Sequence, residues 1–279
     1  MLLFSTAVAA KGLLPDSQPS LEELAYRYGT DKSHDDHKYV DVYAAVFDAY
    51  RDQVANLTEI GVASGQSIQM WHDYFRNARI WGFDKTISDP VHRHFRHQRR
   101  VVLQTRNAYK GPSVNVAPES MDIVIDDAIH RQNYMELLLS KWWPTVRPGG
   151  FYVIEDIECT SPTPGSAEVQ VMMKETPLMA QTKEILEGNM AFFVDPLFGH
   201  RNFTAWNATT VWGTPMTHSR RRHNSYMAFI RKRTAGRPAL PWQQNFVENH
   251  ATHTLTNAMT TEWMKRNPPP QAQREVYEK

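Results

Sequence analysis

Short apolar runs alternate with segments of helical periodicity through the middle of the chain. The apolar runs predict strands at residues 56–62, 78–84, 100–105, 121–127 and 151–157. Residues 64–75 and 133–143 between them have the pattern of helices, and residues 224–232 resemble a late strand at the sheet edge. Because strands that alternate with helices build parallel sheets, this pattern predicts an α/β domain with helices on both faces of the sheet.

The segment before the first strand has a different pattern. Residues 20–53 are predicted to be helical, with Ser20 as a cap and Glu23 completing a capping box. We therefore expect an N-terminal helical extension over residues 1–53, the α/β domain over residues 54–235, and a helical or flexible C-terminal tail over residues 236–279.

Composition narrows the functional classes. The 279 residues include 31 Lys+Arg and 30 Asp+Glu, a balance that gives no general attraction to nucleic acid or to an anionic membrane. Cys159 is the single cysteine, which excludes an internal disulfide and favours a reducing compartment. The first ten residues are apolar but lack a basic n-region and are too short to span a bilayer. We expect a cytoplasmic protein with no nucleic-acid or membrane partner.

A glycine-rich turn follows the first predicted strand. Glu59, Gly61 and Gly65 lie where that strand passes into a helix, and Asp84 ends the next strand. Glycines let a backbone approach a ligand closely, and a strand-end carboxylate suits ribose hydroxyls. Both NAD and S-adenosylmethionine (SAM) enzymes use this geometry, but the G-x-G-x-x-G fingerprint of dinucleotide binding is absent.

Acidic residues gather at the ends of two later strands. Asp126 and Asp127 end one strand, with His130 just beyond it, and Glu155 and Asp156 lie at the end of the other. Carboxylate oxygens are ligands for a hard cation such as Mg²⁺ or Mn²⁺, and a cation beside a hydroxyl lowers its pKa while a histidine takes the proton. Adjacent strand residues point to opposite faces, so Glu155 and Asp156 can bind one ion only where the strand ends or bulges.

Several segments together resemble a known family. The matching segments are Y-G-T-D-K…H-K-Y…Y (28–43), L-T-E-I-G-V-A-S-G-Q-S-I-Q-M-W (57–71), Y-F-R-N-A-R-I-W-G-F-D (74–84), D-I-V-I-D-D-A-I-H (122–130) and R-P-G-G-F-Y-V-I-E-D-I (147–157). In order and spacing they resemble the Mg²⁺-dependent sugar O-methyltransferases of macrolide biosynthesis, of the mycinamicin and demethylmacrocin type. Rhamnosyl and cephalosporin-cluster methyltransferases are more distantly similar.

The resemblance implies a Rossmann-like class I SAM methyltransferase fold and a role for each site residue. It implies metal ligation by Asp127, Glu155 and Asp156, with His130 as the general base. The implied SAM contacts are Glu59, Gly61, Gly65, Ser67 and Asp84. It also suggests that Lys32, His37 and Tyr39 close the cofactor site or form an oligomer contact.

The chain departs from the family pattern at two places. Gln104 and Thr105 stand where the family carries a G-D-Q-like segment, and Ala128 and Ile129 replace the glycine and serine of its D-D-G-S-H motif. The function expected is metal-assisted transfer of a methyl group from SAM to a hydroxyl of a small molecule, with a sugar or glycoside among the candidates. Two alternatives stay open, an NAD(P)-dependent oxidoreductase and a non-catalytic methyltransferase-like binding protein, and the sequence leaves a homo-oligomer open as well.

Overall fold

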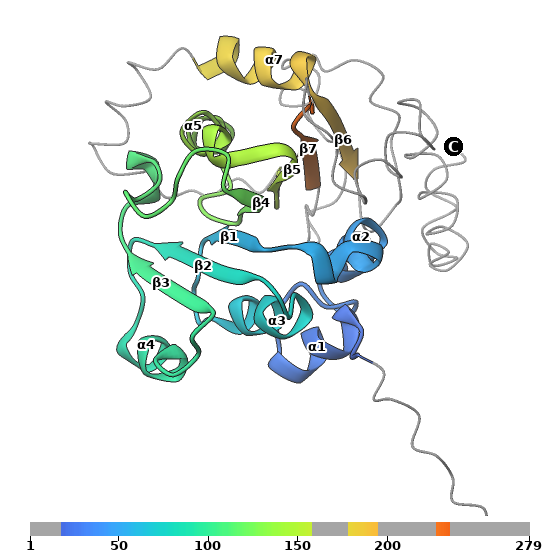
Figure 1. The fold of residues 1–279 in the computed structure, drawn as a ribbon, viewed down its shortest axis with the longest axis vertical. Helices are drawn as coiled ribbons and strands as arrows, with labels where there is room; N and C mark the ends of the chain where they lie inside the picture. Colours follow the sequence, from blue (N-terminus) through green and yellow to red (C-terminus); the bar gives the residue numbers. More distant parts are fainter. Residues whose placement is uncertain (1–17, 158–177, 195–226, 235–279) are drawn as a thin grey trace, which may run out of the picture.

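A seven-stranded sheet forms the centre of the described chain (Figure 1). The computed structural model describes residues 18–157, 178–194 and 227–234. The strand order is β3-β2-β1-β4-β5-β7-β6; β1 to β5 run parallel, while β7 is antiparallel to both of its neighbours. The strands are β1 (Asn56–Ile60), β2 (Arg79–Asp84), β3 (Val101–Thr105), β4 (Met121–Asp126), β5 (Val146–Ile154), β6 (Met190–Val194) and β7 (Met227–Arg231).

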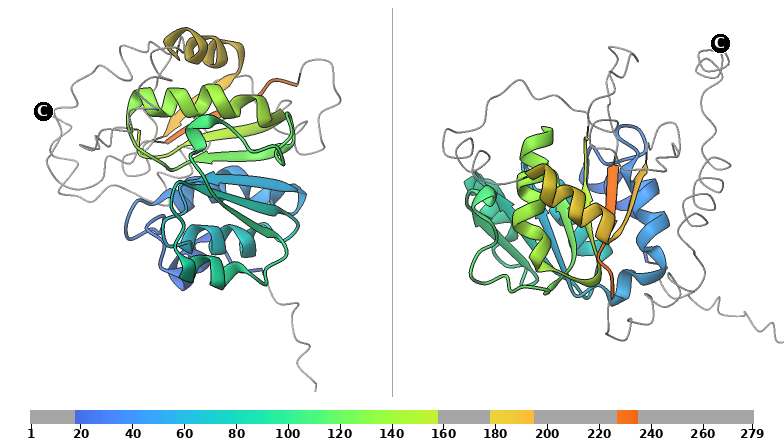
Figure 2. Two further views of the ribbon diagram at one scale, coloured as in Figure 1. Left: turned by 90° about the vertical axis from the view of Figure 1, so that its left-hand side faces the viewer. Right: turned by 90° about the horizontal axis from the view of Figure 1, so that it is seen from above.

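Helices cover both faces of the sheet (Figure 2). They are α1 (Leu21–Tyr28), α2 (Tyr39–Phe47), α3 (Gln66–Tyr74), α4 (Asp89–Phe95), α5 (Gln132–Trp142) and α7 (Leu178–Gly188), with short 3-10 turns at Asp48–Gln53, Ala108–Lys110 and Trp143–Thr145. The first four helices pack on one face, and α5 and α7 pack on the other. Ile123 faces the first core and Val124 the second, as the alternation of side chains along a strand requires. The predicted Rossmann-like α/β fold is confirmed.

The strand order reverses at β1, which lies between β2 and β4. In open parallel sheets, ligands bind beyond the carboxyl ends of the strands at such a switch point. Ile60 pairs with Asp126 at the ends of β1 and β4, and the next residues, Gly61 and Asp127, are in direct contact. A Cβ on Gly61 would lie 1.9 Å from the Asp127 carbonyl oxygen, so only glycine fits there. The fold therefore brings the glycine turn and the acidic loop together.

The N-terminal extension packs into the same core as the sheet. Ser20 caps α1 through the predicted capping box, in which it accepts from the Glu23 N–H while Glu23 bonds back to Ser20. Leu24 and Tyr43 are fully buried against strand residues such as Leu57. The extension therefore belongs to the same packed core as the sheet.

Several expected elements differ in extent from the structure. β5 begins five residues earlier than expected and ends at Ile154, before the acids. The late strand that was expected at the sheet edge is β7, which lies between β5 and β6, and the edge strand β6 was not predicted. The tail over residues 236–279 and the first ten residues lie outside the described chain, and the division at residues 53 and 235 stays a prediction. None of the helices within residues 18–157 and 178–194 combines the length and apolar composition that a membrane span needs.

Candidate functional site

A cavity of about 840 Å³ opens at the switch point of the sheet. Its wall includes the turn at residues 60–64, Asp84 at the end of β2, residues 107–109 and the loop at residues 127–130. Residues 29–31 of the N-terminal extension also line it. The cavity therefore joins the glycine turn, the strand-end acid and the histidine loop that the sequence singled out separately.

Asp84 closes the glycine turn. Its Oδ2 accepts the backbone N–H groups of Val62 at 3.0 Å and Ala63 at 3.3 Å, and its Oδ1 accepts that of Thr86 at 3.1 Å. These bonds fix the carboxylate at the end of β2, where it lines the cavity. A carboxylate held in this way has lone pairs left for the hydroxyls of a ribose.

Glu59, near the end of β1, is fully buried. Ser67 donates to its Oε2 at 2.8 Å, and the indole of Trp71 donates to its Oε1 at 3.1 Å. Burial raises the pKa of the Glu59 carboxyl to about 7. Glu59 therefore ties α3 to β1, and it is not among the residues that line the cavity.

The other three expected SAM contacts divide in the same manner. Gly61 and Ser67 line the cavity, as Asp84 does. Gly65 does not; it begins α3 with a φ of 83°, and a Cβ there would lie 2.9 Å from the Phe95 ring. A glycine is therefore needed at this position because of its left-handed backbone and because α4 packs closely against it.

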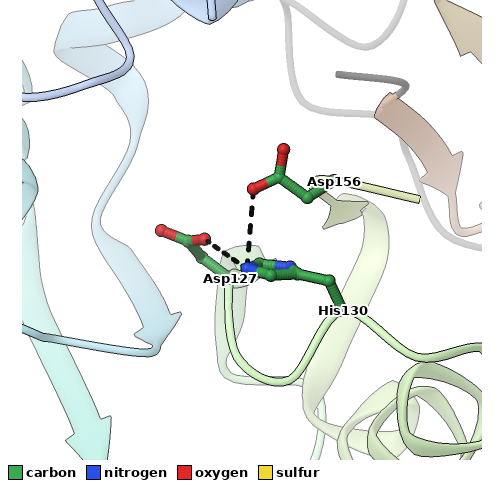
Figure 3. Close-up of side chains that lie close together, drawn as sticks. All are labelled: Asp127, His130 and Asp156. Atoms are coloured by element: carbon green, nitrogen blue, oxygen red, sulfur yellow. Dashed lines mark ion pairs between the residues drawn. The ribbon is translucent and has the colours of Figure 1, made fainter. Parts of the chain in front are cut away.

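Asp127, His130 and Asp156 form a cluster (Figure 3), and the first two of them also line the cavity. The imidazole Nε2 of His130 lies 3.5 Å from Asp156 Oδ2 and 3.9 Å from Asp127 Oδ1. One ligand atom from each residue lies within 4.8 Å of the other two, and all three side chains are partly exposed. Two carboxylates and one imidazole at this spacing are a donor set that fits a divalent cation.

Glu155 points elsewhere. Its side chain is fully buried; Tyr43 donates to Oε1 at 2.5 Å, and Lys32 donates to Oε2. The backbone explains the separation, because β5 ends at Ile154 and Asp156 adopts a left-handed φ of 51°. The sequence analysis required β5 to end or bulge here if Glu155 and Asp156 were to bind one ion, and β5 does end here. The structure nevertheless brings only Asp156 close to His130.

Lys32 lies among three carboxylates at the ends of β1, β4 and β5. Its ammonium is 2.7 Å from Asp127 Oδ2 and 3.8 Å from Glu59 Oε1, and it is bonded to Glu155. Burial by itself would lower the pKa of Lys32, but the carboxylates, Asp127 foremost, outweigh burial and hold that pKa well above its ordinary value. The sequence marked Lys32 by resemblance alone, and its chemistry depends on contacts across the fold.

Asp156 is likewise held from the N-terminal extension. The Tyr39 hydroxyl donates to Asp156 Oδ1 at 2.5 Å and accepts the Asp156 backbone N–H at 3.1 Å. His37 Nδ1 lies 3.5 Å from the same Oδ1. Lys32, His37 and Tyr39, to which the resemblance gave no definite role, therefore all lie in or beside the acidic site.

No family model matches the chain, but curated relatives do. It is 33% identical over 147 residues to 8-demethyl-8-alpha-L-rhamnosyl tetracenomycin-C 2'-O-methyltransferase of Streptomyces olivaceus, a match over 50% of this chain and 38% of that protein. It is also 33% identical over 147 residues to mycinamicin VI 2''-O-methyltransferase of Micromonospora griseorubida, over 50% of this chain and 36% of that one. The chain thus spans well under half the length of these relatives. The resemblance to sugar O-methyltransferases is confirmed.

A solved structure matches the fold. The MycE methyltransferase of the mycinamycin pathway, in complex with Mg and SAH, superposes with a TM-score of 0.51 at 22% sequence identity, over 81% of this chain and 58% of that one. Likeness at this identity establishes the fold alone. The fold is that of the Rossmann-like class I SAM-dependent methyltransferases.

Proposed function

We propose that this chain transfers a methyl group from SAM to a hydroxyl of a small molecule with the help of a divalent cation. One observation carries the proposal: the Asp127 and His130 side chains line the same cavity as Gly61 and Asp84. A cofactor turn and a cluster fit for a cation thus share one space. The curated relatives, which are O-methyltransferases by name, support the same activity.

The cofactor half of the cavity fits SAM. Asp84 would accept the ribose hydroxyls, and the free N–H groups at the beginning of α3 would receive the carboxylate of the methionine portion. SAM supplies an electrophilic methyl group. The absence of a G-x-G-x-x-G turn argues against the oxidoreductase alternative, since a pyrophosphate needs that close backbone approach.

The acidic half of the cavity fits Mg²⁺ or Mn²⁺. Asp127 and Asp156 would hold the ion, which lowers the pKa of a nearby acceptor hydroxyl. Charge supports this assignment, because Asp127 and Asp156 both direct an oxygen toward His130 and a divalent ion would offset these two carboxylates. Ligation by Glu155, which the sequence led us to expect, stays a prediction. Each of its two oxygens accepts a hydrogen bond, one from Lys32 and one from Tyr43.

His130 is the proposed general base. Its imidazole lines the cavity and lies between the two carboxylates that face the cation site. A histidine there can take the proton of an acceptor hydroxyl while the methyl group is transferred. The retained combination of acids and histidine argues against a non-catalytic binding protein.

The acceptor is proposed to be a hydroxylated small molecule, and the relatives' names favour a glycoside. A cytoplasmic location, a homo-oligomer and the absence of nucleic-acid and membrane partners stay predictions.

The direct test is methyl transfer from labelled SAM. Purified full-length protein with Mg²⁺ should label members of a panel of deoxysugar glycosides, lose activity in EDTA, and regain it with Mg²⁺ or Mn²⁺. Melting temperature gives an acceptor-free check, because a bound ligand stabilises the folded state. A rise with SAM but none with NAD is expected; a rise with NAD alone would replace the proposal by the oxidoreductase alternative.

A further inference from the structure

The two carboxylates of the proposed cation site are held in the same way. Asp127 Oδ2 accepts from Lys32, and Asp127 Oδ1 faces His130. Asp156 Oδ1 accepts from Tyr39, and Asp156 Oδ2 faces His130. In each case one oxygen is bound by the N-terminal extension and the other is directed into the site.

We propose that Tyr39 is a positioning residue of the cation site, which holds Asp156 so that its second oxygen faces the ion. The inference rests on the proposed function, because it presupposes a cation at Asp127 and Asp156. It goes further by making the N-terminal extension, which precedes the cofactor turn in the chain, a part of the metal centre.

The geometry favours this role over simple packing. The Tyr39 hydroxyl makes two bonds to one residue, donating to the Asp156 side chain and accepting from its backbone N–H. Asp156 has a left-handed φ of 51°, a conformation that costs a non-glycine residue roughly 1 kcal/mol or more. Two bonds at a strained residue fix both its backbone and its carboxylate. Tyr39 itself is fully buried at the beginning of α2, so its hydroxyl has a fixed origin.

Residues that orient metal ligands contribute measurably to metal affinity. Loss of such a partner typically lowers metal affinity by about 10–100-fold, because the ligand then loses its preferred orientation. Tyr39→Phe removes the hydroxyl and keeps the buried ring. The variant should therefore fold and still bind the ion more weakly.

Helix α2 offers a matched control. The Tyr43 hydroxyl donates to Glu155 at 2.5 Å, the same bond length that Tyr39 makes to Asp156. Both tyrosines are fully buried, but Glu155 is not part of the Asp127–His130–Asp156 cluster. Tyr43→Phe thus loses an equivalent bond on the same helix without touching that cluster.

The experiment measures Mn²⁺ affinity of the full chain by titration calorimetry, with melting temperature recorded for every variant. Tyr39→Phe should raise the Kd by about 10-fold or more, and Tyr43→Phe should leave it within about twofold of the parent, which is the scatter expected for distant changes. In an Asp156→Ala background, Tyr39→Phe should have no additional effect, because the residue it positions is gone.

Three outcomes would overturn the inference. The Kd could be unchanged in folded Tyr39→Phe, both tyrosine variants could weaken Mn²⁺ equally, or Tyr39→Phe could act just as strongly without the Asp156 carboxylate. Failure of the proposed function looks different, since the unaltered protein itself would then bind no Mn²⁺, and that result would remove the cation site together with its positioning residue.

Discussion

Lys32 Nζ lies 2.7 Å from Asp127 Oδ2, although 95 positions separate the two residues in the chain. This contact joins the loop after α1 to the loop after β4, and Glu155 at the end of β5 shares the same ammonium. The N-terminal extension is consequently bound into the site by charge as well as by its apolar packing.

Lys32→Met should destabilise the fold strongly. The substitution leaves Glu155 fully buried without its counter-ion, and loss of one partner of a buried pair costs about 3–5 kcal/mol. Urea denaturation followed by circular dichroism measures the free energy of unfolding. Lys38→Met, a partly exposed lysine in the same loop, is the control and should change this energy by less than about 0.5 kcal/mol. Equal stabilities of the two variants would show that the contact with Asp127 and Glu155 contributes little.

Glu59 should make stability depend on pH. Its pKa is raised from 4.5 to about 7 by burial, so between these values the unfolded chain releases the proton that the folded chain retains. The free energy of unfolding should therefore fall as pH rises from about 4.5 to 7, by up to about 3 kcal/mol, and the contribution should be level on either side of that window.

The Glu59→Gln variant isolates that contribution. Glutamine cannot titrate, so the free energy of unfolding of the unaltered protein, minus that of the variant, should fall by up to about 3 kcal/mol as pH rises across the same window. The exposed Asp52→Asn serves as the control and should leave the pH profile unchanged. Parallel pH profiles for the parent and Glu59→Gln would mean that Glu59 keeps an ordinary pKa in the folded chain.

Asp84→Ala should weaken SAM binding by about tenfold or more, the scale of a lost bond to a charged acceptor. The carboxylate also accepts the Val62 and Ala63 N–H groups, so the turn itself should loosen. Calorimetry with SAM measures the effect. Asp89→Asn, in the first turn of α4 and outside the residues that line the cavity, is the control. An unchanged Kd in folded Asp84→Ala would remove Asp84 from the cofactor site.

The strand-end residues could be predicted from the sequence because the signal is local. Asp84 and Asp127 each follow an apolar run directly, and parallel strands bring such ends to one edge. The contrast between Glu155 and Asp156 could not be predicted, since it depends on the left-handed φ at Asp156 and on where β5 ends. Lys32 and Tyr39 could be marked by resemblance, but their partners lie 95 and 117 positions away in the chain. Contacts at that separation follow from the completed fold and leave no periodic pattern.

Contacts across the fold also explain why the predicted and observed bounds of β5 differ. In β5, Pro148, Gly149 and Gly150 favour a turn by composition, yet they lie within the strand, which begins at Val146. A Cβ on Gly150 would lie 2.7 Å from the Asp122 carbonyl oxygen, so close packing against β4 requires glycine there. Gly150, which favoured a turn in the sequence, is thus explained by its contact with Asp122 in the neighbouring strand.

Asp156→Asn and Glu155→Gln should differ in their effect on Mn²⁺ affinity. Asp156 directs an oxygen toward His130, whereas both Glu155 oxygens accept from Lys32 and Tyr43. We expect Asp156→Asn to raise the Kd by about 10-fold or more, and Glu155→Gln to raise it much less. Calorimetry on both variants decides the ligand set. Equal losses would restore Glu155 as the third carboxylate ligand expected from the sequence.

His130→Ala tests the proposed base. The imidazole lines the cavity and is partly exposed, so its loss should change stability little, and SAM affinity should be retained. Single-turnover methyl transfer should fall by roughly 10²–10⁴, the usual contribution of general acid–base catalysis. The control is His34→Ala, a partly exposed histidine that pairs with Asp41 away from the cavity, and its turnover should match that of the parent.

Mn²⁺ affinity of the same variant separates the two roles that the cluster allows for His130. A base acts on the acceptor and leaves the cation in place, so the Kd for Mn²⁺ in His130→Ala should stay within about threefold of the parent, the context dependence of a single deletion. A ligand holds the cation itself, so its loss would weaken Mn²⁺ and turnover together. His130 Nε2 lies 3.5 Å and 3.9 Å from the two carboxylate oxygens, near enough for either role. Retained Mn²⁺ with lost turnover identifies the base; lost Mn²⁺ makes His130 a ligand, and near-normal turnover eliminates both.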